Sequence, residues 1–548
     1  MRHNMHGMMM NRPLRIADIL TFAEDVHGSA EIVSATVEGG IHRYTYKDAA
    51  LRARKLAQAL LRLGVTPGQR IATLGWNGYR HFELYYAISG IGAVCHTINP
   101  RLSVEQMSYI VSHAEDRILC LDLTFVPLVE AILDHLPKDL RFIIMTDRAH
   151  MPETKLPGAL CYEELVEPET GDYEWPEFSE ETASSLCYTS GTTGHPKGAL
   201  YTHRSTVMHA LMAGVSFLDC LRPGRRILPV VPLFHVNAWG LPYSAPLTGA
   251  SIVFPGPSLD GASLYKLMDE QKVFSAWGVP TVWLGLLGEI RKHGRIPEGF
   301  GEVIIGGSAA PRSMIEAFED LNVSVCHAWG MTEMSPIGTQ GSLAPPLTDL
   351  PKEKQIDLKS TQGRRTFGVD LKIVDANGER QPHDGVATGE LFVRGNTVVS
   401  GYFNNQEASE AAFDAEGWFR TGDVASISPD GFLTITDRAK DLIKSGGEWI
   451  SSIDLENMAI AHPDVANCAV IAVPHPKWDE RPLLIVVPAE GATPDKEKIL
   501  AHLAKGLAKW QVPDDVIFVD TLPLTATGKV SKLTLRQIYA DHSLPEAG

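Results

Sequence analysis

Helix and strand signals alternate along the first two-thirds of this 548-residue chain, and this alternation constrains the fold more than any other feature. Short apolar runs of strand type recur, with helical segments between most of them. One helix is predicted at Lys47–Leu63, which has an apolar stripe and is followed by Gly64 as a stop. Such alternation is typical of α/β layers with mostly parallel sheets. The predicted strands are Ile71–Leu74, Ala93–Thr97, Ile118–Leu121, Phe142–Met145, Ser251–Phe254, Val273–Ala276 and Val303–Ile305.

The pattern changes after about residue 360. Apolar and polar residues then alternate around the turns Asn377-Gly378 and Asp430-Gly431, which predicts a small antiparallel sheet or β-barrel. An α+β unit of about 110 residues follows and is large enough to be a separate domain. The charged break Asp437–Asp441 predicts domains at residues 1–438 and 439–548. The expected segments are Phe367–Asp375, Gly389–Arg394 and Phe432–Thr436, then helix Ile453–Ala461, strands Ala466–Val473 and Leu483–Pro488, helix Lys496–Trp510 and strand Asp515–Val519.

Charge and cysteine content exclude several classes of protein. The chain has 49 Lys and Arg residues against 66 Asp and Glu residues, a formal net charge of −17. Nucleic acids and anionic membranes bind positively charged protein surfaces, so this net negative charge argues against general binding to either. Small anionic substrates held by a few local charges remain compatible with it. The seven cysteines are scattered without a Cys-x-x-Cys pair, which argues against a disulfide framework or a zinc site and favours a reducing, cytoplasmic location.

One uncharged stretch, Ile227–Leu259, has the apolar character of a membrane span. It contains six prolines, and each proline removes a backbone donor and breaks a helix. We therefore expect buried core and a pocket wall here, with no integral membrane contact. The N-terminus lacks the apolar core of a signal peptide, and its several methionines leave a later start open.

The strongest local signal is the string Tyr188–Gly198, YTSGTTGHPKG, which continues a predicted strand at Ser184–Tyr188. Glycines let backbone N–H groups curl around an anion, hydroxyls add donors, and Lys197 adds positive charge. The usual nucleotide P-loop needs Gly-Lys followed by Ser or Thr, whereas Pro196 precedes Lys197 and Gly198 follows it. The string therefore predicts a phosphate-binding loop of another type.

Five further strings follow along the chain: Gly306–Pro311 (GGSAAP), Trp329–Glu333 (WGMTE), Gly417–Asp423 (GWFRTGD), Asp437–Glu448 (DRAKDLIKSGGE) and Pro523–Lys529 (PLTATGK). With the phosphate loop, they resemble the motifs of AMP-forming acyl-CoA synthetases, a family of adenylate-forming enzymes, and they occur in the family's order. The resemblance covers nearly the whole chain. It implies a large N-terminal ATP- and acid-binding domain and a smaller, mobile C-terminal lid that carries the catalytic lysine.

The resemblance also implies a role for each string. Asp423 binds the ribose, since an ionised carboxylate can accept from two hydroxyls, and Arg438 is the second ribose contact. Thr332 donates to a phosphate oxygen, Glu333 binds Mg²⁺ through oxygen, and Lys440 is the hinge. The implied nucleotide, hinge and thiol contacts are Thr189, Ser190, Gly191, Thr192, Thr193, Gly194, Lys197, Gly307, Ser308, Ala309, His327, Ala328, Trp329, Gly330, Met331, Thr332, Asp423, Arg438, Lys440, Gly446, Gly447 and Glu448, with Thr192 and Glu333 at the metal.

Lys529 is the catalytic lysine that the resemblance implies, and it swings in with the lid to bridge the acid carboxylate and the α-phosphate of ATP. Attack of one anion on another needs screening and alignment, which a cation supplies. Lys532 is the rival lysine, but the Gly-Lys placement favours Lys529. The implied reaction forms acyl-AMP and pyrophosphate, after which the thiol of coenzyme A takes the acyl group. Because Lys529 serves the first half-reaction, the lid must turn before the Ser445–Glu448 loop lines the thiol channel.

The string Pro232–Gly240, PLFHVNAWG, carries the clues to the acid. Amino-acid-activating relatives have an aspartate where this chain has His235, so an α-amino acid is disfavoured. His235 either orients the acid or is a packed structural histidine. Trp239 resembles the gating tryptophan of medium- and long-chain fatty acyl-CoA synthetases, and Gly306 completes the predicted pocket. The favoured substrate is a medium- or long-chain fatty acid, and the alternative is 3-methylthiopropionate or another short acid, because methylthiopropionate–CoA ligases share the string.

Other functions remain open at this level. A nucleotide-binding scaffold without catalysis is one, although Lys197, Glu333, Asp423 and Lys529 keep the residue types of the family. Transfer of the acyl group to a carrier protein is another. The sequence around Ser308 resembles the Gly-x-Ser-x-Gly nucleophile elbow of serine hydrolases, but its last residue is alanine. A serine hydrolase is therefore only a remote alternative. A homodimer through the large domain is an expectation of the resemblance.

Overall fold

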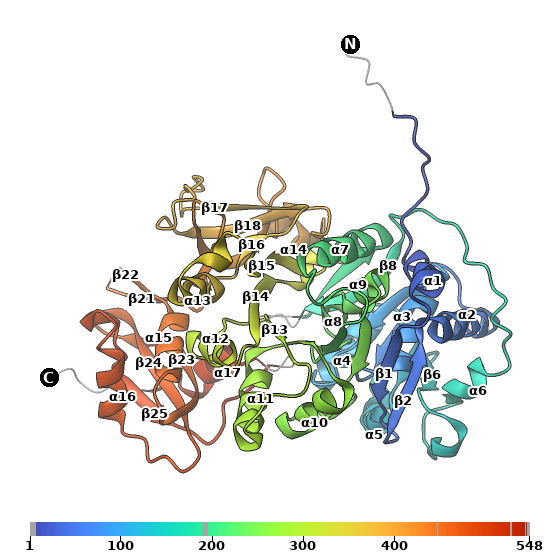
Figure 1. Cartoon of the computed structure of the whole chain (residues 1–548), viewed down its shortest axis with the longest axis horizontal. Helices are drawn as coiled ribbons and strands as arrows, with labels where there is room; N and C mark the ends of the chain where they lie inside the picture. Colours follow the sequence, from blue (N-terminus) through green and yellow to red (C-terminus); the bar gives the residue numbers. More distant parts are fainter. Residues whose placement is uncertain (1–6, 190–194, 447, 526–528, 543, 545–548) are drawn as a thin grey trace.

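The computed structural model describes residues 7–189, 195–446, 448–525, 529–542 and 544 (Figure 1). Four sheets follow one another from a large N-terminal domain to a smaller C-terminal domain, which is drawn in orange and red at one end of the molecule. The predicted α/β architecture with a separate antiparallel unit is confirmed.

A seven-stranded sheet carries the strand that leads into the phosphate loop. Its order is β7-β6-β5-β3-β4-β8-β9, parallel except for the antiparallel pair β8 and β9. The central strands are apolar on both faces because helices cover them. The elements are α2 (Tyr46–Arg62), β3 (Arg70–Leu74), α3 (Tyr79–Gly90), β4 (Val94–Thr97), α4 (Val104–His113), β5 (Asp116–Leu121), α5 (Val126–Ile132), β6 (Arg141–Ile144), β7 (Leu160–Cys161), α6 (Tyr162–Val166), β8 (Ala183–Thr189) and β9 (Lys197–Thr202).

A nine-stranded sheet supplies the adenine-side and acid-side strings. Its order is β16-β15-β14-β13-β12-β10-β11-β1-β2, with parallel strands in the middle and antiparallel strands at both ends. The elements are α1 (Ile16–His27), β1 (Glu31–Ala35), β2 (Ile41–Thr45), α7 (His203–Ser216), β10 (Arg226–Pro229), α8 (Val236–Trp239), α9 (Leu241–Thr248), β11 (Ser251–Phe254), α10 (Gly261–Gln271), β12 (Ser275–Gly278), α11 (Pro280–His293), β13 (Glu302–Ile305), α12 (Arg312–Asp320), β14 (Ser324–Gly330), β15 (Ile337–Gln340), α13 (Lys352–Ser360) and β16 (Arg364–Arg365).

The antiparallel unit is a four-stranded meander, and the C-terminal domain is a mixed sheet flanked by helices. The meander consists of β17 (Val369–Val374), β18 (Gly389–Gly395), β19 (Phe419–Ile427) and β20 (Leu433–Arg438), with α14 (Gln406–Ala411) between β18 and β19. The C-terminal elements are β21 (Ile443–Ser445), β22 (Glu448–Ile450), α15 (Ser452–Ile460), β23 (Val465–His475), β24 (Asp479–Pro488), α16 (Lys496–Leu503), β25 (Asp515–Phe518) and α17 (Lys532–Ile538).

Among the predicted boundaries that differ from the structure, two were wrong for local reasons, while the strand predicted at Leu483–Pro488 begins four residues earlier, at Asp479. The strand expected at Val273–Ala276 begins two residues later, because Lys272 takes a left-handed conformation (φ 53°) and the N–H of Val273 bonds back to Met268 as part of the α10 cap. The helix expected at Lys496–Trp510 ends at Leu503, where the N–H of Gly506 bonds back to the Leu503 carbonyl in a turn. Backbone capping and turn hydrogen bonds decide where each of these two helices stops.

The uncharged stretch is built into the core, as predicted. It contains strand β10, the short segment α8, helix α9 and strand β11, and most of its side chains are buried. None of the helices in the described part of the chain is long and apolar enough to cross a membrane.

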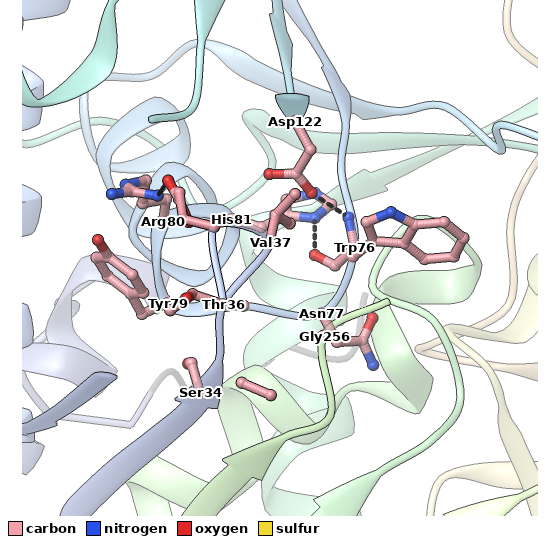
Figure 2. A pocket seen from close by; sticks show the side chains of 13 residues that line it. Ser34, Thr36, Val37, Trp76, Asn77, Tyr79, Arg80, His81, Asp122 and Gly256 are labelled. Atoms are coloured by element: carbon pink, nitrogen blue, oxygen red, sulfur yellow. Dashed lines mark hydrogen bonds and ion pairs between the residues drawn. The ribbon is translucent and has the colours of Figure 1, made fainter. Parts of the chain in front are cut away.

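Asn77 ties this stretch to the start of α3. Its side-chain N–H groups donate to the carbonyls of Pro229 at 2.7 Å and Val231 at 2.9 Å, and its oxygen accepts from the N–H of Leu233 at 2.6 Å. Figure 2 shows Asn77 beside a cavity of about 20 Å³, room for about one water molecule. That cavity lies where β1, β3 and β5 end, and Asp122 accepts there from the Trp76 N–H at 2.6 Å.

Substituting Asn77→Ala should lower the free energy of unfolding by about 3 kcal/mol, because three buried backbone groups lose partners worth about 1 kcal/mol each. The shift in the midpoint of urea unfolding, followed by tryptophan fluorescence, measures it. Asn377→Ala, at an exposed turn, is the matched control and should shift the midpoint little. Equal shifts in the two variants would contradict this account of the Asn77 contacts.

Candidate active site

Asp423 and Arg438 face each other across two paired strands of the meander. They are register partners in β19 and β20, and Arg438 Nε lies 2.8 Å from Asp423 Oδ1. Trp329, at the end of β14, donates its indole N–H to Asp423 Oδ2 at 2.9 Å. Burial raises the pKa of Asp423, and Arg438 opposes that rise. The expected ribose contacts thus form one hydrogen-bonded group that joins the meander to the nine-stranded sheet.

Lys529 reaches this group from the C-terminal domain. Gly307 has a φ of 82°, and a Cβ atom built there would lie 3.4 Å from Lys529 Cε and 3.8 Å from Nζ, so the lysine lies against the glycine. Burial and the Arg438 charge lower the pKa of Lys529 to about 8, while Asp423 acts in the opposite direction. The ammonium group is therefore mostly protonated at neutral pH and loses its proton as pH rises through about 8.

Lys532, the rival lysine, is engaged elsewhere. Its Nζ lies 2.8 Å from Glu456 Oε1 and 2.5 Å from Ser452 Oγ, at the start of α15. Burial acts to lower the pKa of Lys532, but the Glu456 and Asp437 carboxylates raise it overall. Asp437 also accepts from the N–H and the hydroxyl of Ser452, both at 2.6 Å. Lys532 is therefore paired within the C-terminal domain, whereas Lys529 lies among the expected nucleotide contacts.

Glu333 occupies a buried position suited to a metal-bound triphosphate. Its Oε1 accepts from the Tyr402 hydroxyl at 2.8 Å, and Lys197 Nζ lies 5.1 Å from the Tyr402 ring centroid. Burial raises the pKa of Glu333, while Tyr402, Arg438 and Lys197 oppose the rise. Thr332, which begins the same short turn, is buried, and its carbonyl accepts from the Tyr201 hydroxyl at 2.5 Å.

Mg²⁺ fits this donor set. The described residues contain no cluster of three or more His, Cys, Asp or Glu side chains that would make a protein-only metal site. Mg²⁺ commonly uses one or two carboxylates and completes its shell with water and substrate phosphates. Glu333 can supply that carboxylate. Tyr402 was missed at the level of sequence, because a lone aromatic residue in a loop carries no periodic signal.

The two ends of the phosphate loop are held together by the β8–β9 pair. Thr189 and Lys197 are register partners, so the loop closes on a hydrogen-bonded base. The remaining predicted loop contacts, and one glycine of the predicted thiol loop, lie outside the described residues: Ser190, Gly191, Thr192, Thr193, Gly194 and Gly447.

The adenine-side string lies between β13 and α12, next to β14. His327 on β14 pairs with Ile305 of β13, and its Nδ1 is buried without a hydrogen-bond partner among the described residues. Burial lowers the pKa of His327 to about 4, so the ring is neutral. A buried, unpaired ring nitrogen is a site where a planar heterocycle can bond. The other predicted contacts along this edge are Gly306, Gly307, Ser308, Ala309, Ala328, Gly330 and Met331.

His235 and Trp239 flank a short turn instead of a helical face. Trp239 and the three residues before it have positive φ angles, so the turn is left-handed and is not a turn of right-handed helix. Burial and the Lys529 charge lower the pKa of His235 to about 3, so its imidazole is neutral. The indole of Trp239 lies against Gly306, where a Cβ atom would meet its Cη2 at 3.0 Å.

The predicted thiol-channel residues lie on a hairpin of the C-terminal domain. A Cβ atom at Gly446, which has a φ of 62°, would lie 2.8 Å from the Trp478 ring. Ser445, which pairs with Glu448, accepts from Arg481 at 3.0 Å. Lys440 is exposed between the two domains. The structure thus brings Lys529 to the expected nucleotide contacts, whereas Gly446 and Glu448 are exposed on the hairpin of the C-terminal domain.

Comparisons with known proteins agree with this arrangement. The family model for AMP-binding enzymes matches residues 22–403, and the model for the C-terminal domain of AMP-binding enzymes matches residues 454–529. The chain is 51% identical over 544 residues to a 3-methylmercaptopropionyl-CoA ligase of Ruegeria lacuscaerulensis, covering 98% of this chain and 99% of that one. It is 48% identical over 538 residues to a medium-chain-fatty-acid–CoA ligase of Ectopseudomonas oleovorans, covering 98% of each chain.

A solved structure of the anthranilate CoA ligase AuaEII, in complex with anthranoyl-AMP, shares the fold. Its TM-score is 0.85 at 25% identity, over 97% of this chain and 98% of that one. The matches span both domains, and the relatives named above are CoA ligases. The chain therefore belongs to the AMP-binding enzyme family and is an AMP-forming acyl-CoA synthetase, a class that uses ATP, Mg²⁺ and coenzyme A.

Proposed function

We propose that the preferred acid is short, unbranched and apolar, of the size of 3-methylthiopropionate. The contact between the Trp239 indole and Gly306 carries this proposal. An acid bound between His235 and Trp239 would meet the indole there, which would limit the length of its tail. The methylmercaptopropionyl-CoA ligase at 51% identity supports it, since the methylmercapto and methylthio names describe the same group.

A medium-chain fatty acid is the second candidate. Gly306 has no side chain to clamp the indole, and Trp239 is only partly buried, so rotation of the indole would open the pocket. The relative at 48% identity is a medium-chain ligase, which supports this candidate. Each added methylene gains only about 0.8 kcal/mol of transfer free energy, so a modest cost of moving Trp239 decides between the two acids.

His235 and Lys529 complete the acid site in this proposal. The neutral imidazole of His235 offers one N–H to the acid carboxylate without a net charge. Lys529 lies between Asp423 and Gly307, where its ammonium group can bridge the carboxylate and the α-phosphate. A carboxylate oxygen then bonds to the α-phosphorus while the bond to the β-phosphate oxygen breaks and pyrophosphate leaves. The thiol of coenzyme A later displaces AMP from the acyl carbon.

We place the domain division at residue 438, with Lys440 as the hinge about which the lid turns between the half-reactions. The observed position of Lys529 corresponds to the first half-reaction, and a turn would bring the hairpin of Gly446 and Glu448 to the acyl-AMP. Mg²⁺, held through Glu333 and Thr192, would screen the phosphate charge.

Location and assembly are also proposals. A cytoplasmic location is supported by the seven cysteines, all unpaired and buried. A homodimer through the large domain is supported by an exposed apolar surface on and near α1 and α7. That surface consists of Phe22, Val26, Leu211, Val215 and Leu218.

The rate of acyl-AMP formation should fall as pH rises through about 8. Only the protonated form of Lys529 is a cation, and the pKa of Lys529 in the free enzyme is about 8. The plot of kcat/KM for ATP against pH should show this decline as a descending limb, since kcat/KM reports ionisation of the free enzyme. Bound phosphates stabilise the cation, so the limb in kcat should lie at higher pH. Lys529→Arg, which stays charged, should remove the limb, and an unchanged limb in that variant would refute the assignment.

Lys529→Ala should abolish acyl-AMP formation, measured as pyrophosphate exchange, and spare the reaction of supplied acyl-AMP with coenzyme A. The lysine screens the attack on the α-phosphate and is not needed for thiol attack. Lys532→Ala is the matched control: it removes a cation bound to Glu456 and Ser452, so it should lower stability and affect both half-reactions alike. Equal losses in both half-reactions for Lys529→Ala would contradict its role.

A panel of acids from C3 to C16, with 3-methylthiopropionate included, should give the highest kcat/KM on 3-methylthiopropionate or an acid of its length. Trp239→Ala should move the optimum to longer acids and raise kcat/KM on octanoate by about tenfold, because the pocket gains the volume of the indole. Pyrophosphate release measures both, and Trp510→Ala, far along the chain in the C-terminal domain, should change neither. A wild-type optimum at octanoate or longer would favour the second candidate.

A further inference from the structure

Five consecutive residues, Val236–Gly240, have positive φ angles of 48°, 52°, 47°, 55° and 77°. Only the last is a glycine. A left-handed conformation costs an L-residue about 1–2 kcal/mol, and non-glycine residues normally visit it singly. A run of four such residues persists only where the surroundings impose it, and such strain clusters at functional sites.

The side chain of Asn237, in the middle of the run, is the anchor. It is buried, its Nδ2 donates to Ser185 Oγ at 3.1 Å, and its Oδ1 lies 3.1 Å from the Tyr85 hydroxyl and 3.5 Å from Cys187 Sγ. Burial raises the pKa of Cys187 to about 11, so the thiol keeps its proton and can donate. Asparagine also tolerates the left-handed region better than most residues.

The anchor joins the turn to two rigid elements. Ser185 and Cys187 lie on β8, the strand that continues into the phosphate loop, and Tyr85 lies on α3. The Tyr85 hydroxyl, which has a single proton and lies 3.1 Å from Asn237 Oδ1, is also within bonding distance of the Leu233 carbonyl at 2.5 Å, three residues before the turn. Any shift of the turn relative to the phosphate loop would therefore break buried hydrogen bonds, whose loss costs about 1–3 kcal/mol for each unsatisfied group.

The turn separates the two side chains that bound the acid. His235 immediately precedes it and is near enough to Lys529 for that charge to lower its pKa, while Trp239, near the end of the turn, lies against Gly306. Backbone bonds inside the turn keep it tight: the N–H of Ala238 bonds to the His235 carbonyl at 3.2 Å, and that of Gly240 to the Asn237 carbonyl at 2.9 Å. A relaxed turn would move the carboxylate end and the tail end of the acid pocket relative to each other.

We propose that Asn237 is a positioning residue for acid selection: its buried amide, held by Ser185 and Tyr85, maintains the left-handed turn that sets the distance from His235 to Trp239. The inference rests on the acid site proposed above, in which these two side chains bound the substrate. The side chain of Asn237 contacts Ser185, Tyr85 and Cys187, and in this proposal it acts through His235 and Trp239.

The test is Asn237→Gly. Glycine adopts positive φ without cost, so the backbone conformation stays accessible while the amide anchor is lost. KM for the acid should rise about tenfold, and the ratio of kcat/KM between the best acid and one about four carbons longer should fall about fivefold, since small misplacements of a bound group change rates strongly. KM for ATP should stay within about twofold of wild type. Ser185→Ala, which removes only the partner of Nδ2, should change the same two quantities in the same direction, by less.

Asn322→Gly is the matched control, because Asn322 also has a positive φ, of 58°, but lies at an exposed turn after α12. It should leave the acid KM and the selectivity ratio unchanged. The proposal is overturned if Asn237→Gly keeps both quantities, or if it lowers kcat equally for all acids. If Asn237→Gly does not fold, unchanged values in Ser185→Ala overturn it. The ratio is measured whichever acid is best, so a failure of the proposed acid is distinguishable from a failure of this role.

Discussion

The buried carboxylate of Asp423 is the interaction on which the rest of the site depends. It accepts from Trp329 of the nine-stranded sheet and from Arg438 of the meander, and it acts on Lys529 of the C-terminal domain. Burying a charge is costly unless it is paired and hydrogen-bonded. The groups that act on Asp423 come from three parts of the structure, so the electrostatic requirement of one side chain helps define how those parts meet at the expected nucleotide site.

This arrangement explains how an acidic chain can handle ATP and coenzyme A, which are both polyanions. The formal charge of −17 describes the whole surface, whereas Lys197, Arg438 and Lys529 lie at the site. Charges in a partly buried cleft are screened less than charges on an open surface. Desolvation next to Arg438 also lowers the pKa of Lys529 to about 8, so the cation that serves the reaction is held at some electrostatic cost.

The acid side of the site depends on a strained backbone turn, whereas the nucleotide side depends on paired charges. Its string is mostly apolar, and local preference alone does not favour a run of four left-handed residues that are not glycine. Side chains far away in sequence, Asn77 and Tyr85 on one side and Ser185 on the other, impose the left-handed turn instead. A misplaced turn would leave those buried polar groups without partners, so hydrogen bonding offsets the backbone strain and gives the pocket a defined shape.

The sequence by itself determined the α/β class, most strands to within one or two residues, the order of the two domains and the family, because periodicity and contiguous motifs are local properties. It also distinguished Lys529 from Lys532 by the Gly-Lys placement, and the structure separates their surroundings. Only the tertiary structure decided the ends of α10 and α16, the Tyr402 contact to Glu333, the lowered pKa of Lys529 and the turn at Asn237. Each of these depends on burial or on partners distant in sequence, and the local pattern of residues determines neither.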